Sequence, residues 1–262
     1  MKQTSPRRPV RLAPLLLAIA GFALAACGGD GTAAEVRVNT PTATPSPAAT
    51  AAVATRTTPA PDSCAAFAQK ADPYLLKVVD KQRGLPQDYR PTDLQAIDAR
   101  WATPGFAAAS MRADAASAIV QLLSAAEAQG VELRIRSSFR SYGEQARTFQ
   151  FWIDQLGEAQ ARRESAPPGH SEHQLGTTAD VISRSVGWEL ISEFGATAEG
   201  KWLAAHMADY GFALSYPPDG EAVTGYIYEP WHVRYVGKAC AAEWRASGQV
   251  LVKFLEQLPA GR

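Results

Sequence analysis

The chain has 262 residues, with 26 basic and 26 acidic side chains and a formal net charge of zero. This balance provides no broad basic surface, so nucleic acid is not an expected partner. All six tryptophans lie between residues 63 and 262, a stretch of roughly 200 residues that is long enough for one sizeable core in one domain.

The N-terminal segment has the pattern of an export signal. Basic residues precede an apolar run over residues 12–23, which is too short to span a bilayer as a permanent anchor. Small residues then lead to Cys27, a pattern that resembles the lipobox of bacterial lipoproteins. We therefore expect residues 1–26 to be removed and Cys27 to be lipidated; an ordinary signal peptide with an incidental cysteine is the alternative.

Residues 27–62 are rich in Thr, Pro, Ala and Gly and poor in large apolar side chains. Such a composition does not repay the entropy of folding, so we expect a disordered tether. Cleavage before Cys27 would leave 22 basic and 26 acidic residues, a net charge of −4. The predicted location is extracytoplasmic, with the lipid anchor as the only membrane contact, on the outer face of the bacterial cell membrane.

The remaining residues, 63–262, are expected to form a single α+β domain. Cys64 and Cys240 are an even pair in an oxidising compartment, which predicts a disulfide; two buried free thiols are the alternative. Apolar spacing and turn residues predict helices over 65–82, 106–129, 142–156, 189–194 and 200–210, and strands over 131–137, 178–183, 212–216, 226–229 and 232–236. Residues 94–101 are ambiguous. The strands cluster late in the chain, which favours a small antiparallel sheet flanked by helices.

A possible metal site lies in this domain. His173 and Asp180 are seven residues apart with Gly176 between them, so a turn can bring both side chains to one point, and His232 can add a third ligand. Two histidines and one carboxylate are typical of a catalytic zinc. Spacing alone leaves open the commoner case of histidines satisfied in the core. Glu229 favours the metal site, because a zinc hydrolase needs a carboxylate near the metal, and Pro230 can bend the chain between Glu229 and His232.

Four blocks of sequence resemble the VanY-type D-alanyl-D-alanine carboxypeptidases of peptidase family M15. The blocks occur in the family's order, and the similarity extends over about residues 94–237. They are Ser138-Phe139-Arg140-Ser141-Tyr142-Gly143-Glu144-Gln145, Pro168-Gly169-His170-Ser171-Glu172-His173-Gln174-Leu175-Gly176, Asp180-Val181, and Glu229-Pro230-Trp231-His232-Val233-Arg234-Tyr235-Val236-Gly237.

The resemblance implies the α+β fold shared by these DD-peptidases and the hedgehog signalling domain. It also implies one zinc ion per chain held by His173, Asp180 and His232, with Glu229 as the catalytic base. Arg140 is assigned to the substrate, at whose carbonyl it would stabilise negative charge.

Further substrate contacts are hypotheses from residue chemistry. Gln145 and Ser171 could bind the terminal carboxylate of a peptide. Trp231 and Tyr210 could wall the pocket, although core packing is the more frequent role of such side chains. Other motif residues remain open: Glu172 and Arg234 could orient the ligands or form a structural salt bridge, and His170 could compete for metal or lie at the rim of the site.

These features predict a monomeric zinc-dependent D-alanyl-D-alanine carboxypeptidase that acts on peptidoglycan stem peptides. An L,D-carboxypeptidase or a D,D-dipeptidase could use the same site, and the sequence does not separate them. A non-catalytic wall-binding lipoprotein would be expected to lack a ligand or the base. A solute-binding lipoprotein fits the anchor and tether, but it gives no reason for the Glu229 to His232 motif.

Overall fold

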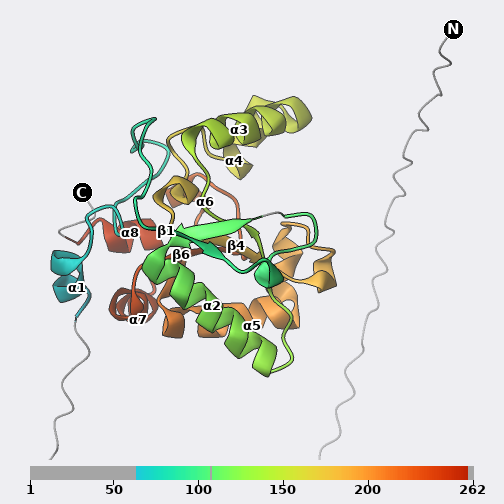
Figure 1. Ribbon diagram of the computed structural model, residues 1–262. Coiled ribbons are helices and arrows are strands. Elements are labelled where there is room, and N and C mark those ends of the chain that lie inside the picture. The colour runs from blue at the N-terminus through green and yellow to red at the C-terminus, as the bar shows by residue number, and fades with distance from the viewer. Residues whose placement is uncertain (1–62, 107, 259–262) are drawn as a thin grey trace, which may run out of the picture. The chain divides into compact units, whose positions relative to one another are not determined.

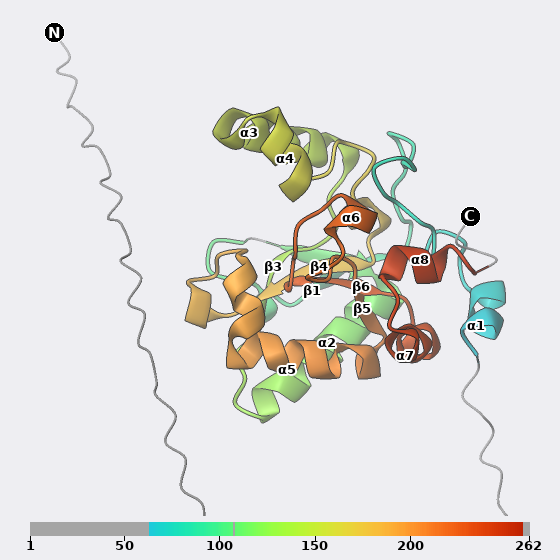
Figure 2. The ribbon, with the colours of Figure 1, turned by 180° about the vertical axis from the view of Figure 1, so that it is seen from behind.

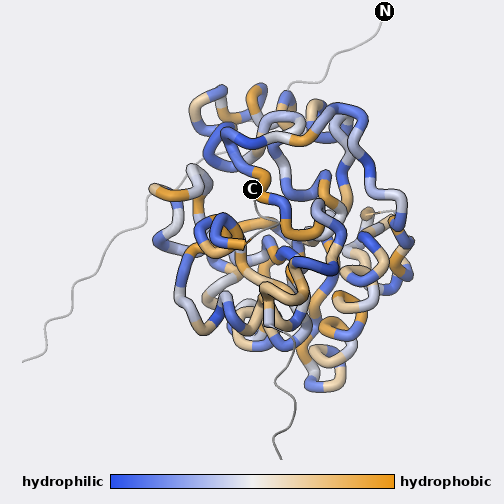
Figure 3. The backbone as a smooth tube through the Cα atoms, turned by 90° about the vertical axis from the view of Figure 1, so that its left-hand side faces the viewer, coloured by the Kyte–Doolittle hydropathy of each residue, from blue (hydrophilic) through white to orange (hydrophobic). Residues whose placement is uncertain are grey.

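The computed structural model describes residues 63–106 and 108–258. The predicted signal over 1–26, the lipidation at Cys27 and the tether over 27–62 lie outside the described residues and stay predictions. Within the described part, no helix combines the length and apolarity needed to cross a bilayer. Hydrophobic and hydrophilic stretches are interleaved along the trace (Figure 3), as expected where each element buries only one side.

The domain contains eight α-helices and six strands within the described residues. The helices are α1 (Cys64–Lys70), α2 (Ala113–Ala128), α3 (Tyr142–Leu156), α4 (Glu158–Glu164), α5 (Ala198–His206), α6 (Glu221–Thr224), α7 (Lys238–Ser247) and α8 (Leu251–Leu255). The strands are β1 (Leu94–Ile97), β2 (Ala109–Arg112), β3 (Arg134–Ser137), β4 (Thr178–Ile182), β5 (Phe212–Leu214) and β6 (His232–Tyr235). Short 3-10 helices span Ala99–Trp101, Glu172–Leu175, Arg184–Val186, Ser192–Ala196 and Met207–Tyr210.

A four-stranded antiparallel sheet with the order β3-β4-β6-β5 forms the centre of the domain. Strands β1 and β2 form a separate antiparallel pair. Helices α2, α5 and α7 lie on one side of the sheet, and α3, α4 and α6 lie on the other (Figures 1 and 2). The α+β class predicted from the sequence is confirmed, and the two middle strands are β4 and β6.

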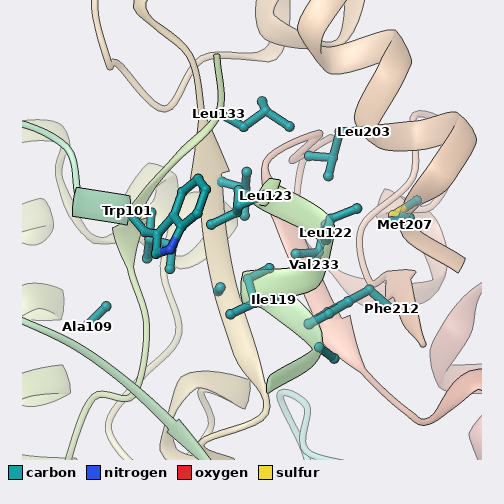
Figure 4. Close-up of a cluster of buried hydrophobic side chains, with 14 of the residues drawn as sticks. Trp101, Ala109, Ile119, Leu122, Leu123, Leu133, Leu203, Met207, Phe212 and Val233 are labelled. Atoms are coloured by element: carbon teal, nitrogen blue, oxygen red, sulfur yellow. The ribbon is translucent and has the colours of Figure 1, made fainter. Parts of the chain in front are cut away.

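The largest apolar cluster lies between α2 and the sheet. Ile119, Leu122 and Leu123 of α2 are essentially inaccessible and lie in one cluster with Phe212 and Val233 (Figure 4). Their spacing of three and four residues places them on one face of the helix. This cluster fixes the face of β6 that looks away from α3 and α4.

The first predicted helix is much shorter in the structure than expected. Helix α1 ends at Lys70, and Ala71 is already extended with ψ 154°. Pro73 disfavours a helical conformation at Asp72, which explains the early end. Residues 72–89, which we call the strap, then continue without a regular helix or strand. Several of their apolar side chains are nevertheless buried, as listed here: Leu75, Leu76, Val78, Val79 and Leu85.

Three other predicted elements differ from those observed. The helix expected over 106–129 begins only at Ala113, because residues 109–112 pair with β1 as strand β2. Residues 226–229 form no strand; Ile227 N–H donates to Arg163 and Glu229 N–H donates to Tyr216. The segment over 189–194 gives only the 3-10 helix Ser192–Ala196. In the first two cases tertiary hydrogen bonds override local propensity.

The predicted disulfide between Cys64 and Cys240 is confirmed. It joins α1 to α7 across 176 residues of sequence, and both cysteines are fully buried in a second apolar cluster with Leu76, Val236 and Leu251. A crosslink across so long a loop restricts the unfolded chain strongly.

We expect the double substitution Cys64→Ser with Cys240→Ser to lower the free energy of unfolding by about 2–5 kcal/mol, because the unfolded chain regains the entropy of the open loop. Denaturant unfolding measures the effect. Addition of a thiol reductant should lower the stability of the unsubstituted protein by a similar amount and leave the double variant unchanged. Equal stability of the variant and the oxidised protein would contradict the prediction.

Candidate metal centre

The sheet register places two of the predicted ligands opposite each other. Asp180 of β4 pairs directly with His232 of β6. The third, His173, lies in the 3-10 helix Glu172–Leu175, and Gly176 follows it in the left-handed region with φ 73°. This turn returns the chain into β4, so the three side chains converge, with ligand atoms within 4.8 Å of one another. All three residues are buried.

Each histidine lies at a zinc-compatible distance from one oxygen of Asp180. His173 Nε2 lies 3.3 Å from Asp180 Oδ2, and His232 Nδ1 lies 3.3 Å from Asp180 Oδ1. Metal–ligand bonds of 2.0 to 2.2 Å at tetrahedral angles imply ligand separations of about 3.3 to 3.5 Å. The two imidazole rings are nearly perpendicular, at 89°. The three residues therefore form a group that can hold a metal ion such as zinc.

The hydrogen bonds of the two histidines also favour a cation between them. His173 Nδ1 lies 2.7 Å from Ser138 O, to which it donates, so Nε2 of the neutral ring carries a lone pair. His232 Nε2 lies 3.0 Å from Glu172 Oε2 and donates to it, so Nδ1 carries the lone pair. Both lone pairs face Asp180, whose buried Oδ1 has no hydrogen-bond partner. A hydrogen bond from the second ring nitrogen to a carbonyl or carboxylate oxygen usually fixes the tautomer and orientation of a metal-binding histidine.

The electrostatics of Asp180 and His232 also favour a positive charge between the ligand atoms. Burial opposes the ionised form of Asp180, but His173 and His232 outweigh it and hold the pKa of that carboxyl well below its usual range. Burial likewise opposes a proton on His232, yet the neighbouring carboxylates of Asp180 and Glu172 raise the pKa of the ring to about 10. A metal ion at Nδ1 would supply the positive charge in place of that proton.

Glu229 reaches the centre through a turn at Pro230, which confirms the predicted bend between Glu229 and His232. His232 N–H donates to Glu229 O at 3.1 Å, which closes the turn over Pro230 and Trp231. The Glu229 carboxylate then lies beside the free ligand nitrogen, with Oε2 3.4 Å from His232 Nδ1. Burial raises the pKa of Glu229 to about 8. The position and the raised pKa suit a group that exchanges protons at the metal.

Arg140 follows strand β3 and faces the same site. Its Nε is buried and has no hydrogen-bond partner, and Asp180 and Glu229 are among the nearby charges. Burial lowers the pKa of the guanidinium, although the acidic groups counteract the shift. A buried donor without a partner can stabilise negative charge on a ligand that enters the site.

The metal-binding group lies in a cavity of about 620 Å³. Of the four predicted substrate contacts, Ser171 and Trp231 line this cavity, whereas Gln145 and Tyr210 do not. Gln145 is buried and donates from Nε2 to Ala166 O at 2.6 Å, which positions the loop after α4. Tyr210 packs against the main apolar cluster. These two residues therefore support the pocket instead of facing it.

The structure also shows the positions of His170 and of three aromatic residues whose roles the sequence did not specify. His170 is absent from the metal-binding group, and its Nδ1 lies 2.7 Å from Asp80 O in the strap. Tyr216, for which no contact was predicted, packs its ring 4.7 Å from that of His232 and lines the cavity. The cavity also extends to Trp152 of α3 and to Trp188. Trp188 has φ 67°, a strained backbone that no sequence pattern signals.

Proteins with sequences similar to this chain are carboxypeptidases. The family model for VanY, D-alanyl-D-alanine carboxypeptidase, matches residues 108–238. The putative carboxypeptidase YodJ of Bacillus subtilis (strain 168) is 39% identical over 185 residues, which cover 70% of this chain and 68% of YodJ.

Solved structures extend the likeness to the fold. The LD-carboxypeptidase LdcB is 39% identical with a TM-score of 0.64, over 71% of this chain and 88% of LdcB. The D,D-pentapeptidase VanY from a VanB-type resistance cassette, solved in complex with Zn(II), is 26% identical with a TM-score of 0.58, over 70% of this chain and 99% of that protein. The chain therefore belongs to the VanY family of D-alanyl-D-alanine carboxypeptidases, and it is a zinc metallo-carboxypeptidase with His173, Asp180 and His232 as its metal-binding group.

Proposed function

We propose that the protein hydrolyses the peptide bond before the C-terminal D-amino acid of peptidoglycan stem peptides. The observation that carries the proposal is the placement of the Glu229 carboxylate 3.4 Å from His232 Nδ1, inside a cavity that also contains Arg140. A metal-binding group with an adjacent base and an unpaired cationic donor supplies the parts required for amide hydrolysis.

Zinc held by His173, Asp180 and His232 would acidify a water molecule and polarise the scissile carbonyl. Glu229 accepts the proton of the attacking water and delivers it to the leaving amine. Arg140 donates to the carbonyl oxygen as its negative charge grows. Loss of one such donor costs roughly 2.7 to 4 kcal/mol of transition-state stabilisation. Ser171, whose Oγ accepts from His173 N–H at 3.3 Å, lines the cavity and is our candidate for contact with the terminal carboxylate.

The bond cleaved can be of two kinds. The family description supports a D,D-carboxypeptidase, which removes the last residue of a pentapeptide stem. A second candidate, an L,D-carboxypeptidase that shortens a tetrapeptide stem, is supported by the higher identity with LdcB than with the solved zinc-bound VanY. Both reactions release D-alanine and would use the same zinc group.

We expect Glu229→Gln to keep zinc near one ion per chain and to lower turnover about 10²- to 10⁴-fold, because the amide cannot accept the proton. Asp180→Asn should lower both zinc content and turnover, because it weakens a ligand. Metal analysis and D-alanine release measure the two effects. Glu158→Gln, in an exposed salt bridge with Arg162, serves as the control and should change neither. Full activity of Glu229→Gln would exclude the proposed role of this residue.

The two candidate reactions can be separated by incubation of the zinc-loaded protein with pentapeptide and tetrapeptide stems, followed by mass spectrometry. A D,D-carboxypeptidase converts the pentapeptide to the tetrapeptide, whereas an L,D-carboxypeptidase converts the tetrapeptide to the tripeptide. A chelator should stop either reaction and added zinc should restore it. A stem ending in L-alanine is the control for stereochemistry. If no D-alanine is released from either stem, the proposed function is wrong.

We also propose that the enzyme acts outside the cytoplasm, held at the membrane by lipid on Cys27, because stem peptides lie on that side. In cells of a bacterial host, the protein should partition with membranes, and Cys27→Ser should release it or leave it unprocessed. Metabolic labelling with a fatty acid reports the modification directly. Absence of label on the unsubstituted protein would refute the lipid anchor.

A further inference from the structure

The strap, residues 72–89, lies before the part of the chain that matches the family model, yet it contacts the residues on each side of the zinc ligand His173. Gln174 Nε2 donates to Pro86 O at 3.0 Å and to Tyr89 O at 3.1 Å. Leu175 forms a small apolar cluster with Val79 and Leu85 of the strap. The turn that presents His173 is therefore packed against the strap and not only against the sheet.

The strap also binds the loop that enters this turn. Leu85 N–H donates to Gly169 O at 2.8 Å, and His170 Nδ1 lies 2.7 Å from Asp80 O. A side chain at Gly84 would lie 3.1 Å from the His170 ring, which shows how closely the two segments approach. His170, which lies outside the metal-binding group, thus fixes the loop to the strap three residues before His173.

A second connection runs from the strap to His232 through Arg234. Arg234 and His232 are two residues apart on β6, so their side chains leave the same face of the strand. Arg234 Nη2 donates to Lys77 O at 2.7 Å and to Leu75 O at 3.3 Å, while Nη1 donates to Glu172 Oε1 at 2.6 Å. The strap is irregular here, which leaves these carbonyl groups available to a side-chain donor.

Glu172 completes the connection. Its Oε2 accepts from His232 Nε2 at 3.0 Å and from Ser215 Oγ at 2.6 Å. Glu172 and Arg234 are both buried, so each charge depends on the other for compensation. Without the guanidinium, the carboxylate would lose the bond that fixes its rotation and would hold the His232 ring less firmly. Partners of this kind typically change metal affinity 10- to 100-fold.

We propose that the strap is a structural part of the zinc centre. Arg234 is the positioning residue that connects the strap to His232, through Glu172. The strap orients one ligand through the turn around His173 and the other through Arg234 and Glu172. This inference rests on the zinc-binding group and not on the substrate assigned above, so it can be tested in the absence of any peptide.

Zinc affinity, measured by competition with a chromophoric chelator, is the main readout. We expect Arg234→Met to weaken zinc binding about 10- to 100-fold and to shift the visible absorption bands of the cobalt-substituted protein, which report ligand geometry. Arg112→Met is the matched control, because buried Arg112 also holds the strap, through Asp72, but has no bond to a ligand. Arg112→Met should lower the melting temperature and leave zinc affinity and the cobalt spectrum unchanged.

Arg234→Lys keeps the charge but cannot bridge Glu172 and two carbonyls with a planar fork, so its zinc affinity should be intermediate. Two conservative substitutions in the strap, Val79→Ala and Val78→Ala, test its contact with the turn around His173. Val79 and Val78 are adjacent and similarly buried, but Val79 packs against Leu175 whereas Val78 lies in the cluster with Cys64 and Cys240. Val79→Ala should weaken zinc binding, while Val78→Ala should lower stability alone.

Two results would overturn the proposal. One is unchanged zinc affinity and an unchanged cobalt spectrum in folded Arg234→Met or Arg234→Lys. The other, which decides the matter if neither Arg234 variant folds, is equal zinc affinity of Val79→Ala and Val78→Ala. Failure of the protein to release D-alanine from stem peptides would refute the proposed function and leave this inference untouched, because zinc binding is measured without substrate.

Discussion

The pairing of β4 with β6 is the constraint on which the site depends. It sets Asp180 directly opposite His232, and facing residues of an antiparallel pair are close enough for both side chains to reach one ion. A shift of one residue in this register would turn one ligand to the other face of the sheet. The apolar cluster under α2 secures the register, because Val233 and Val181 are fully buried in it.

The zinc centre next to β4 and β6 contains several buried charged side chains. Asp180, Glu172, Glu229, Arg140 and Arg234 all lie within or beside the centre, and most are nearly inaccessible. Isolated buried charges are costly, so each must be paired or must bind an ion. Arg234 compensates Glu172, whereas Asp180 and the lone pairs of two histidines remain directed at one point. The unequal pairing leaves a net demand for a cation where the ligands meet.

The buried ion pair of Arg234 with Glu172 explains why the strap, which precedes the family-matched region, is part of the zinc centre. The central position of β6 buries Arg234 in the sheet, and its guanidinium needs more acceptors than Glu172 alone supplies. Irregular backbone can offer carbonyl oxygens that a helix or strand would have used. The strap meets this need, and the Cys64–Cys240 disulfide ties the helix before it to the helix after β6.

Several features followed from the sequence because they depend on local chemistry. The α3 helix was predicted with the bounds observed, and in the structure a capping box of Ser141 and Glu144 fixes its start. The spacing of the zinc ligands, with Glu229 beside His232, indicated a metal site, and the resemblance of these motifs to the VanY-type family assigned the ligands and the base. The disulfide followed from the number of cysteines. Strand β2 was missed, because a strand's pairing partner is not encoded in local periodicity. The early end of α1 was missed although Pro73 signals it locally, because the apolar spacing continues beyond the proline.

The sequence by itself therefore determined which side chains form the centre and the α+β class of the domain. Only the tertiary structure decided which of the motif residues face the cavity. Gln145 and Tyr210 carry suitable groups, but Gln145 is held by Ala166 O and Tyr210 by the apolar cluster. Tertiary structure also gave Arg234 and His170 their partners in the strap, and it gave Glu172 its bonds with Arg234, His232 and Ser215. Those contacts join residues up to 159 positions apart, and no pattern along one chain specifies which distant carbonyl a buried donor will meet.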